Sequence, residues 1–387
     1  MKKRMLNMAM IAIISTAFIA GCTEIEPAEF IETAAVGIPG EPDPEPPPPP
    51  PPYDPITDPA NIALREWKAT PGLPQTFVWF DNWAGGTAGQ YSLSGLPDSV
   101  TIASNWGQPK WGLTELQKTD MEYVQKVKGT KVVVTLFSAK VGDDVDADPI
   151  YNVGNSTDVA VIGPAIKKYA EAIYDKVVAE GYDGYDWDYE PQGGGSSANY
   201  LWTVQAQRRL FVSELGYWFG KSASTRTDRG DRKPVEQELL FLIDGEIGTR
   251  GRMDKNWESY NVDYFVLQAY GSASTASINT RVNGVLDDMS DWISAGTITK
   301  AEVVRRTILT ENFESYSGNG GGVLVQSKYI HKPTSGTHVG VDQQIGGFGI
   351  YRVGFDYRSA RTFQGSSEYG FLREGIYNIY SIYRSRQ

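Results

Sequence analysis

Three acidic residues alternate with aromatic residues in the segment 183–190, which reads DGYDWDYE. Because the side chains of an extended strand point alternately to its two faces, Asp186, Asp188 and Glu190 are expected to share one face. Like charges held side by side raise one another's pKa, so some of these acids are expected to be protonated at neutral pH. A protonated carboxyl beside an ionised one suits general acid catalysis at a sugar acetal.

Two structural interpretations compete with this hypothesis. A solvated edge strand would need neither the aromatic residues on the opposite face nor Gly184 within it. A helix–loop–helix calcium site requires a glycine after the third ligand and a distant glutamate, and the segment has neither. The catalytic interpretation of the segment 183–190 is therefore favoured.

The segment resembles the DGxDxDxE signature of glycoside hydrolase family 18, which contains chitinases and endo-β-N-acetylglucosaminidases. All five fixed positions are occupied, by Asp183, Gly184, Asp186, Asp188 and Glu190. The resemblance implies retaining hydrolysis in which the substrate, and not the enzyme, supplies the nucleophile. It further implies that Glu190 is the proton donor, that Asp188 holds the acetamido group of N-acetylglucosamine, and that Asp186 shares a proton with Asp188.

A second segment, Gln268-Ala269-Tyr270, resembles the family position whose tyrosine orients the acetamido carbonyl group of the substrate. The resemblance therefore implies a catalytic role for Tyr270. Chitinases of the family commonly carry Met-x-Tyr-Asp at this position, whereas this chain has Gln268 and Gly271 in place of the Met and the Asp. The segment 312–345 is also too short for the α+β insertion that many of these chitinases carry. Both departures favour the endo-β-N-acetylglucosaminidase branch.

The resemblance to this branch implies that the substrate is the N,N′-diacetylchitobiose core of N-linked glycans on glycoproteins. Two alternatives remain open at this point. The first is a chitinase that cleaves polymers of β-1,4-linked N-acetylglucosamine. The second is a catalytically silent glycan-binding protein on the same scaffold, which would be marked by loss of the acid; Glu190 is present.

Eight apolar or β-branched runs predict strands, and helical periodicities lie between several of them. The runs are Thr76–Trp83, Ser99–Trp106, Lys131–Ser138, Tyr182–Glu190, Leu239–Glu246, Tyr264–Tyr270, Val303–Glu311 and Gly346–Val353. A capping box is expected at Thr114 and Gln117, before a helix that stops near Gly129. This alternation predicts an α/β fold, and eight strands predict a (β/α)8 TIM barrel with a parallel sheet.

Residues at the C-terminal ends of the barrel strands are expected to build the active site. Aromatic rings there can stack on sugar rings, and amides or carboxylates can bind hydroxyl groups. The substrate-binding candidates at these strand ends are Gln268, Trp83, Asp81, Asn105, Trp106, Glu311, Asn312 and Tyr351.

The N-terminus has the pattern of a targeting segment. Three basic residues precede an apolar run from Met8 to Ala20, which is too short for a membrane span and predicts a signal peptide over residues 1–21. The sequence Ile19-Ala20-Gly21-Cys22 resembles the bacterial lipobox, which implies that Cys22 is lipidated and anchors the protein in a membrane. Cys22 is the only cysteine of the chain, so an internal disulfide is excluded.

Residues 22–60 are predicted to form an acidic, proline-rich tether. From Thr23 to Ala60 the chain has nine acidic residues and no Lys or Arg, and seven prolines run from Pro46 to Pro52. This composition cannot bury a core and favours disorder or polyproline II. Acidic residues after a lipidated cysteine resemble the surface-export signal of Bacteroidetes-type lipoproteins, which implies an outer-membrane protein exposed at the cell surface.

Residues 61–387 are expected to form one catalytic domain, and we expect it to be monomeric. The whole chain has a net charge of −11, which argues against nucleic acid as a partner. No cofactor or metal is expected. The alternating acids Asp144, Asp146 and Asp148 could bind calcium, but the glycine of such a loop is missing, so a solvated loop is favoured. A Ser-His-Asp triad that uses His331 or His338 has no further support.

Overall fold

The computed structural model describes residues 53–86, 89–154, 156–191, 200–247 and 261–387. The predicted signal peptide, Cys22 and residues 22–52 of the predicted tether lie outside the described residues. The described chain forms a compact unit from Tyr53 onward. Its first helix begins at Pro59, after the N-cap Asp58, so the helical shell begins two residues before the predicted domain boundary at 61.

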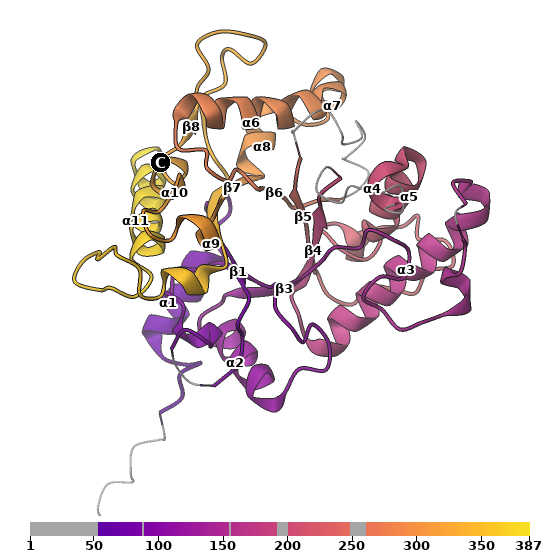
Figure 1. Cartoon of the computed structure of the whole chain (residues 1–387), viewed down its shortest axis with the longest axis horizontal. Helices are drawn as coiled ribbons and strands as arrows, with labels where there is room; N and C mark the ends of the chain where they lie inside the picture. Colours follow the sequence, from indigo (N-terminus) through magenta and orange to yellow (C-terminus); the bar gives the residue numbers. More distant parts are fainter. Residues whose placement is uncertain (1–52, 87–88, 155, 192–199, 248–260) are drawn as a thin grey trace, which may run out of the picture. The chain divides into compact units, whose positions relative to one another are not determined.

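Eight parallel strands close into a barrel, and the prediction of a (β/α)8 fold is confirmed (Figure 1). Their order around the barrel is β1-β10-β7-β6-β5-β4-β3-β2. The strands are β1 (Gln75–Phe80), β2 (Ile102–Asn105), β3 (Lys131–Leu136), β4 (Gly184–Tyr189), β5 (Leu240–Gly245), β6 (Tyr264–Leu267), β7 (Thr307–Asn312) and β10 (Gly347–Tyr351). A short antiparallel pair, β8 (Ile330–His331) and β9 (Gln343–Gln344), lies between β7 and β10 in the chain.

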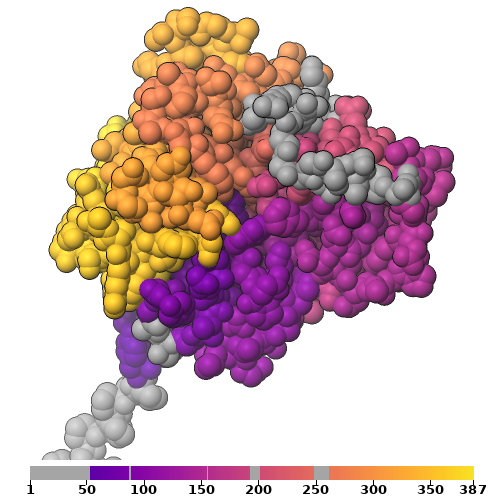
Figure 2. All heavy atoms as spheres, viewed as in Figure 1, coloured from indigo at the N-terminus to yellow at the C-terminus, as the bar shows by residue number. Residues whose placement is uncertain are grey.

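Helices surround the barrel, and in space-filling form the segments follow one another around the molecule in chain order until the last adjoins the first (Figure 2). The α-helices are α1 (Pro59–Lys68), α2 (Glu115–Lys126), α3 (Val159–Glu180), α4 (Tyr200–Thr203), α5 (Gln205–Leu215), α6 (Thr275–Asp288), α7 (Ser290–Ala295), α8 (Lys300–Arg305), α9 (Phe313–Tyr316), α10 (Val323–Gln326) and α11 (Gly370–Ser385). In the described ranges, single turns of 3-10 helix lie at Leu93–Gly95, Pro149–Tyr151, Ala223–Thr225 and Val353–Asp356. Of the helices in the described ranges, none is long and apolar enough to cross a membrane.

The predicted strands agree in order with the observed ones but differ from them in their bounds, most clearly at β7. The predicted run Val303–Glu311 contains β7, but Val303 and Val304 belong to α8. A capping box starts this helix, because the Thr299 hydroxyl accepts the Glu302 N–H while the Glu302 carboxylate accepts the Thr299 N–H. Local capping therefore outweighs the β propensity of the two valines. The capping box predicted at Thr114 and Gln117 is present at the start of α2.

The motif strand β4 separates two environments. Tyr185, Trp187 and Tyr189 are fully buried in the core between the barrel and its helices. The alternate residues Asp186 and Asp188 share the opposite face, as the alternation predicts, and this face points into the barrel. The strand therefore holds its carboxylates inside the barrel because its aromatic face is fixed by packing outside it.

The glycine of the motif has a local structural cause. A Cβ atom on Gly184 would lie 2.4 Å from the carbonyl oxygen and 2.8 Å from the nitrogen of Leu240 on β5. Both are backbone atoms of a paired strand, so they cannot move aside without disturbing the barrel. Gly184 thus permits the close pairing of β4 with β5.

We expect Gly184→Ala to lower the free energy of unfolding by about 1–3 kcal/mol, because the added methyl group overpacks a strand pair. Gly163 in α3 is a matched control, since a Cβ there would meet only side chains at ordinary contact distances, Leu210 at 3.4 Å and Val159 at 4.0 Å. Gly163→Ala should be neutral or stabilising, because alanine is the better helix former. Urea denaturation of both variants measures the difference. Equal stability of the Gly184 variant and the wild type would contradict this account of the motif glycine.

Candidate active site

A layer of polar side chains lies inside the barrel above an apolar floor. The floor is a buried cluster of Phe77, Trp79, Ile102, Val133, Leu242, Val266 and Ile308. One step further toward the C-terminal strand ends lie polar residues of neighbouring strands: Ser104, Thr135, Asp186, Asp188, Asp244 and Gln268. The C-terminal end of the barrel thus carries the chemistry, as expected for this fold.

Asp186 is the deepest acid of the row and is held by several donors. Its Oδ2 accepts hydrogen bonds from Trp79 Nε1 at 3.0 Å and from Thr135 Oγ1 at 2.7 Å. The Thr135 hydroxyl is in turn 2.5 Å from that of Ser104. These contacts fix the carboxyl orientation and favour a charged Asp186, since both donors reach the same oxygen.

Asp188 has an acidic neighbour that the sequence analysis missed. In the register of the β4–β5 pair, Asp188 lies opposite Asp244, which is 1% exposed. Gln268 Nε2 donates to Oδ1 of Asp188 at 3.3 Å and to Oδ1 of Asp244 at 3.1 Å. The only sequence signal for Asp244 was its place near the end of a predicted strand. Gln268, predicted to bind substrate, instead bridges two carboxyl groups.

The three buried aspartates all have perturbed pKa values. Burial raises the pKa of Asp186 above its ordinary value. Burial and then the charges of Glu190 and Asp186 raise the pKa of Asp188 well above the ordinary value. Burial and then the charges of Asp186 and Asp188 raise the pKa of Asp244 in the same way. The site therefore holds protons at a pH where ordinary aspartates have lost them.

Glu190 follows β4 directly and is the outermost acid of the row. Its side chain is half-buried, whereas Asp188 is 3% and Asp186 0% exposed. Strand geometry puts residues two apart about 6.6 Å from each other along the strand. A substrate entering from the C-terminal end of the barrel would therefore reach Glu190 before Asp188. The residues 192–199, which follow, lie outside the described part of the chain.

An arc of aromatic rings runs beside the acids. The Tyr270 ring stacks on the Tyr351 ring with 6.1 Å between centroids, and Tyr351 meets Trp106 edge-on at 5.9 Å. The arc continues from Trp106 to Phe137 at 5.3 Å and from Phe137 to Trp202 at 5.9 Å. Three predicted site residues, Tyr270, Trp106 and Tyr351, are thus brought together, and Phe137 is 39% exposed. Phe137 and Trp202 were not anticipated.

A cation lies next to this arc. The Lys110 ammonium group is 5.5 Å from the centre of the Trp106 ring and 3.9 Å from the Asp144 carboxylate. Burial lowers the pKa of Lys110, while the charges of Asp144 and Asp188 oppose that effect. The sequence offered no signal for Lys110, because its loop after β2 carries no motif.

Glu311 was predicted to bind substrate, and the structure corrects this. Its side chain points out of the barrel, where its carboxylate accepts the backbone N–H groups of Gly271 at 2.9 Å, Asn312 at 2.8 Å and Gly322 at 2.6 Å. The residue is fully buried. Because Gly271 directly follows Tyr270, Glu311 anchors the loop that carries Tyr270. Its role is to position the loop.

Two more predicted substrate-binding residues are also turned away from the barrel interior. Trp83 is 5% exposed in the core outside the barrel, and its Nε1 donates to Asp120 Oδ2 at 2.8 Å. Asn105 is 3% exposed, and its Nδ2 donates to the Tyr182 hydroxyl at 2.8 Å. Neither side chain offers a free face to a sugar. The prediction failed for Trp83 because β1 already ends at Phe80. It failed for Asn105 because this residue lies on the face of β2 that points away from the barrel interior.

The remaining two candidates make structural contacts at the strand ends. The Asp81 carboxylate accepts Arg352 Nε at 2.6 Å, which ties the end of β1 to the end of β10. The Asn312 side chain caps α9 by accepting the Ser315 N–H at 3.3 Å. The structure thus assigns each of them a partner within the protein.

The acidic loop and the two histidines, which were the alternative candidate sites, make other contacts in the structure. Asp144, Asp146 and Asp148 each pair with a lysine, namely Lys110, Lys176 and Lys168, so the loop forms ion pairs with its surroundings. In the described ranges no cluster of three or more acidic, His or Cys side chains could hold a metal ion. His331 bonds to the Tyr329 hydroxyl and His338 to Asp287, both away from the carboxyl row.

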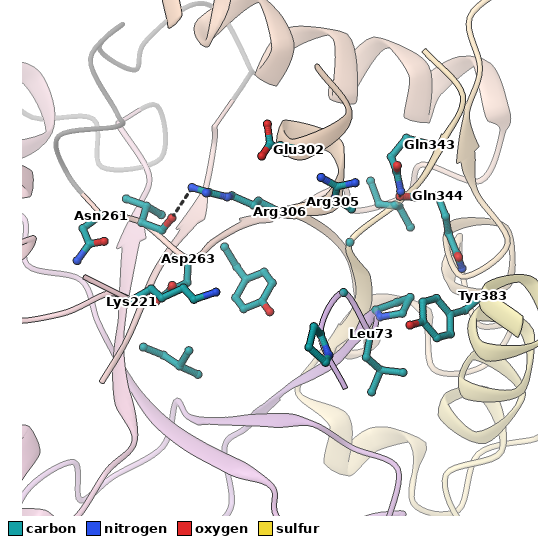
Figure 3. A pocket seen from close by; sticks show the side chains of 18 of the residues that line it. Leu73, Lys221, Asn261, Asp263, Glu302, Arg305, Arg306, Gln343, Gln344 and Tyr383 are labelled. Atoms are coloured by element: carbon teal, nitrogen blue, oxygen red, sulfur yellow. Dashed lines mark hydrogen bonds between the residues drawn. The ribbon is translucent and has the colours of Figure 1, made fainter. Parts of the chain in front are cut away.

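A pocket of about 900 Å³ opens at the other end of the barrel (Figure 3). It is lined by the segment before β1, by the start of β6 at Asp263 and by the end of α8 at Arg305 and Arg306. Arg306 Nη1 donates to the carbonyl oxygen of Val262 across its wall. These are the N-terminal strand ends, which stabilise the barrel fold and do not carry its chemistry. The carboxyl row is therefore the candidate active site.

We expect Glu311→Gln to lower the free energy of unfolding by about 1–3 kcal/mol, because an amide NH2 group would face buried N–H groups that lose their acceptor. Glu314→Gln is the matched control, since Glu314 pairs with Arg352 while 50% exposed and should lose less than about 1 kcal/mol. Denaturant titration measures both. Equal effects of the two substitutions would show that the buried N–H groups do not depend on the charged acceptor.

Comparison with known proteins gives the family. Residues 61–377 match the model described as glycoside hydrolase family 18, BT1044-like. A solved structure of a selenomethionine variant of BT1044 is similar over 84% of this chain and 93% of that chain, with 25% identity and a TM-score of 0.61. A mutant endo-β-N-acetylglucosaminidase from Cordyceps militaris, in complex with fucosyl-N-acetylglucosamine-Asn, is similar over 84% of this chain and 96% of that chain, with 16% identity and a TM-score of 0.51.

The second likeness supports the shared fold alone, because its identity is low. Among curated protein sequences, none matches the chain. The family model spans the barrel, including the acids Asp186, Asp188 and Glu190. The chain therefore belongs to the BT1044-like group of glycoside hydrolase family 18 and is a glycoside hydrolase.

Proposed function

We propose that this protein is an endo-β-N-acetylglucosaminidase that hydrolyses the β-1,4 linkage in the N,N′-diacetylchitobiose core of N-linked glycans. The observation that carries the proposal is the arrangement around Asp188. Glu190 lies above it on the same strand, and Tyr270 lies close enough for the charges of Asp188 and Glu190 to act on its phenol. This arrangement suits a sugar whose acetamido group enters deeper than its glycosidic oxygen.

In the proposed first step, Glu190 donates its proton to the glycosidic oxygen and the bond to the leaving sugar breaks. The carbonyl oxygen of the 2-acetamido group attacks C1 and forms an oxazolinium ion. Asp188 accepts a hydrogen bond from the acetamido N–H and stabilises the positive charge. Burial raises the pKa of Tyr270 well above its ordinary value, so the phenol keeps its proton and can donate it to the acetamido carbonyl oxygen as a hydrogen bond.

In the second step, Glu190 removes a proton from a water molecule that attacks C1. The oxazolinium ring opens, and the anomeric configuration is retained. Substrate assistance is favoured because Asp188 lies a strand step deeper than Glu190 and is held by Gln268. A carboxylate held at that depth is placed to meet an acetamido group and less well placed to attack C1 itself.

The preference for N-glycans over chitin rests on the residue at the strand-six position. Gln268 occupies the place where chitinases that resemble this chain commonly have methionine, and its amide is engaged by Asp188 and Asp244. The part of the aromatic arc from Tyr270 to Phe137, which is not fully buried, adds apolar faces for sugars on one side of the acids. A polar site with one aromatic wall suits a branched oligosaccharide that also carries a protein.

A substrate panel tests the proposal. The protein is incubated with glycoproteins of high-mannose, hybrid and complex type and with free chitooligosaccharides, and the products are weighed by mass spectrometry. Release of glycans that leave one N-acetylglucosamine on asparagine is expected. Cleavage of chitooligosaccharides alone would show a chitinase, and binding of glycans without any product would show a non-catalytic binding protein.

We expect Glu190→Gln and Asp188→Asn to impair different parts of the reaction. Glu190→Gln removes the transferable proton, so turnover should fall by about 10²–10⁴-fold while glycan binding persists. Asp188→Asn should also cripple hydrolysis, yet it should accept a preformed sugar oxazoline as donor, because that substrate bypasses the first step. Hydrolysis is followed by chromatography and binding by calorimetry. Trapping of a covalent glycosyl adduct on Asp188 by a 2-fluoro sugar would replace this mechanism with an enzymic nucleophile.

We further propose that Cys22 is lipidated and tethers the enzyme to the outer membrane, where it meets glycoproteins. The support is the basic and apolar run before Gly21-Cys22 and the acidic, proline-rich stretch after it. Cys22→Ala should abolish membrane retention of the processed protein, as measured by fractionation and intact mass. Processed Cys22→Ala protein that stays in the membrane fraction would contradict lipid anchoring.

A further inference from the structure

Asp244 is a fully buried acid that neither the sequence motif nor the reaction scheme uses. It lies on β5, opposite Asp188 in the strand register, and is 1% exposed. Its carboxyl group lies next to those of both Asp186 and Asp188, close enough to share a proton with them. Asp186, in contrast, acts on Asp188 through its charge. The group that joins the acids of β4 therefore comes from the next strand.

The distribution of hydrogen-bond donors in this cluster is uneven. Oδ2 of Asp186 accepts from Trp79 and Thr135, whereas Asp244 accepts only through Oδ1, from Gln268. Among the described residues, Oδ1 of Asp186 and Oδ2 of Asp244 are the carboxyl oxygens buried without a partner. Two ionised carboxylates in contact cannot satisfy each other, because both only accept. One proton on Oδ2 of Asp244 would satisfy both oxygens at once.

We propose that Asp244 is a positioning residue that stays protonated, donates a hydrogen bond to Asp186, and keeps a third negative charge away from Asp188. This inference rests on the proposed function, because its consequence concerns the ionisation of Asp188 during the reaction. Asp188 must be negative to stabilise an oxazolinium ion. An ionised Asp244 beside it would force Asp188 to take up a proton instead.

The other groups around Asp244 agree with this assignment. Asp186 and Asp188 on β4 and Glu190 directly after it are all acidic and oppose a charge on Asp244, and Tyr270 after β6 is a neutral phenol. The amide of Gln268 is its one described donor. The Lys110 ammonium group acts on Asp188. Burial and these acids raise the pKa of Asp244 well above its ordinary value.

Asparagine is the informative substitution at this position. Its Oδ1 can accept from Gln268 as Asp244 Oδ1 does, and its Nδ2 can donate to Asp186 in place of the carboxyl proton. Asp244→Asn thus keeps the hydrogen bonds of a protonated aspartate, whereas Asp244→Ala removes them. If Asp244 were ionised in the active protein, the two variants would be impaired alike.

The first readout is the pH dependence of stability, which requires no substrate. A group whose pKa is raised on folding binds more protons in the native state, so it makes the free energy of unfolding fall as pH rises above the unfolded aspartate value of about 3.9. Asp244→Asn has no ionisable group at this position, so it does not lose this part of its stability as pH rises. Its free energy of unfolding, relative to the wild type, should therefore rise as pH increases from about 4 toward neutrality. A relative stability that falls with pH would overturn the proposal.

The second readout is infrared spectroscopy. The C=O stretching band of a buried, protonated carboxyl group should be present in the full-length protein at neutral pH and should weaken in Asp244→Asn. Asp120→Asn is the control, because the equally buried Asp120 carboxylate accepts three N–H groups, from Trp83, Leu93 and Ser94. This substitution should leave the band in place. A band that Asp244→Asn does not change would also overturn the proposal.

The third readout is the turnover number of each variant, measured as the rate at which it releases glycans from a glycoprotein. Asp244→Asn should keep at least about tenfold more turnover than Asp244→Ala, because only the Asn variant satisfies Asp186 without adding a charge. The difference should lie in kcat more than in KM. An equal loss of turnover in both variants would contradict the proposal that Asp244 acts as a neutral group. If the wild type hydrolyses no glycan, the proposed function fails, and stability and the infrared band still decide the protonation of Asp244.

Discussion

The structure depends on the burial of acidic side chains at one end of the barrel. Moving a carboxylate out of water is costly unless it is hydrogen-bonded or protonated. Both solutions are used here. Asp186 receives two donors on one oxygen, whereas burial and neighbouring charges raise the pKa values of Asp188 and Asp244. The barrel provides the rigid frame that keeps these groups together, because the tightly packed aromatic face of β4 fixes the opposite face.

The same physics explains the acids that lie outside the carboxyl row. Glu311 is as deeply buried as Asp186, but it points to a turn and accepts three backbone N–H groups. Asp81 lies near the strand ends too, and it is neutralised by Arg352. An acid that accepts several donors or a guanidinium group stabilises the loop that it holds. An acid that has mainly other acids for neighbours is available for proton transfer.

The two ends of the barrel have different roles because all of its strands run in the same direction. All eight barrel strands are parallel, so the loops that follow them meet at one end, together with Glu190, Tyr270 and the aromatic arc. The pocket at the other end is lined by charged residues such as Asp263 and Arg306 that begin strands or end helices. Its size alone does not make it a reaction site, because it lacks a row of coupled acids.

The sequence by itself determined the strand succession, the motif and the shared face of Asp186 and Asp188, because strand alternation and local hydrophobic patterns are encoded within a few residues. Only the tertiary structure decided which side chains meet across strands. The β4–β5 register places Asp244 beside Asp188, and no local pattern reports a register. The directions of Trp83 and Glu311 were also undecided. Trp83 lies beyond the end of its strand, where alternation no longer applies. Glu311 lies within a strand, but alternation does not say which of the two strand faces points into the barrel.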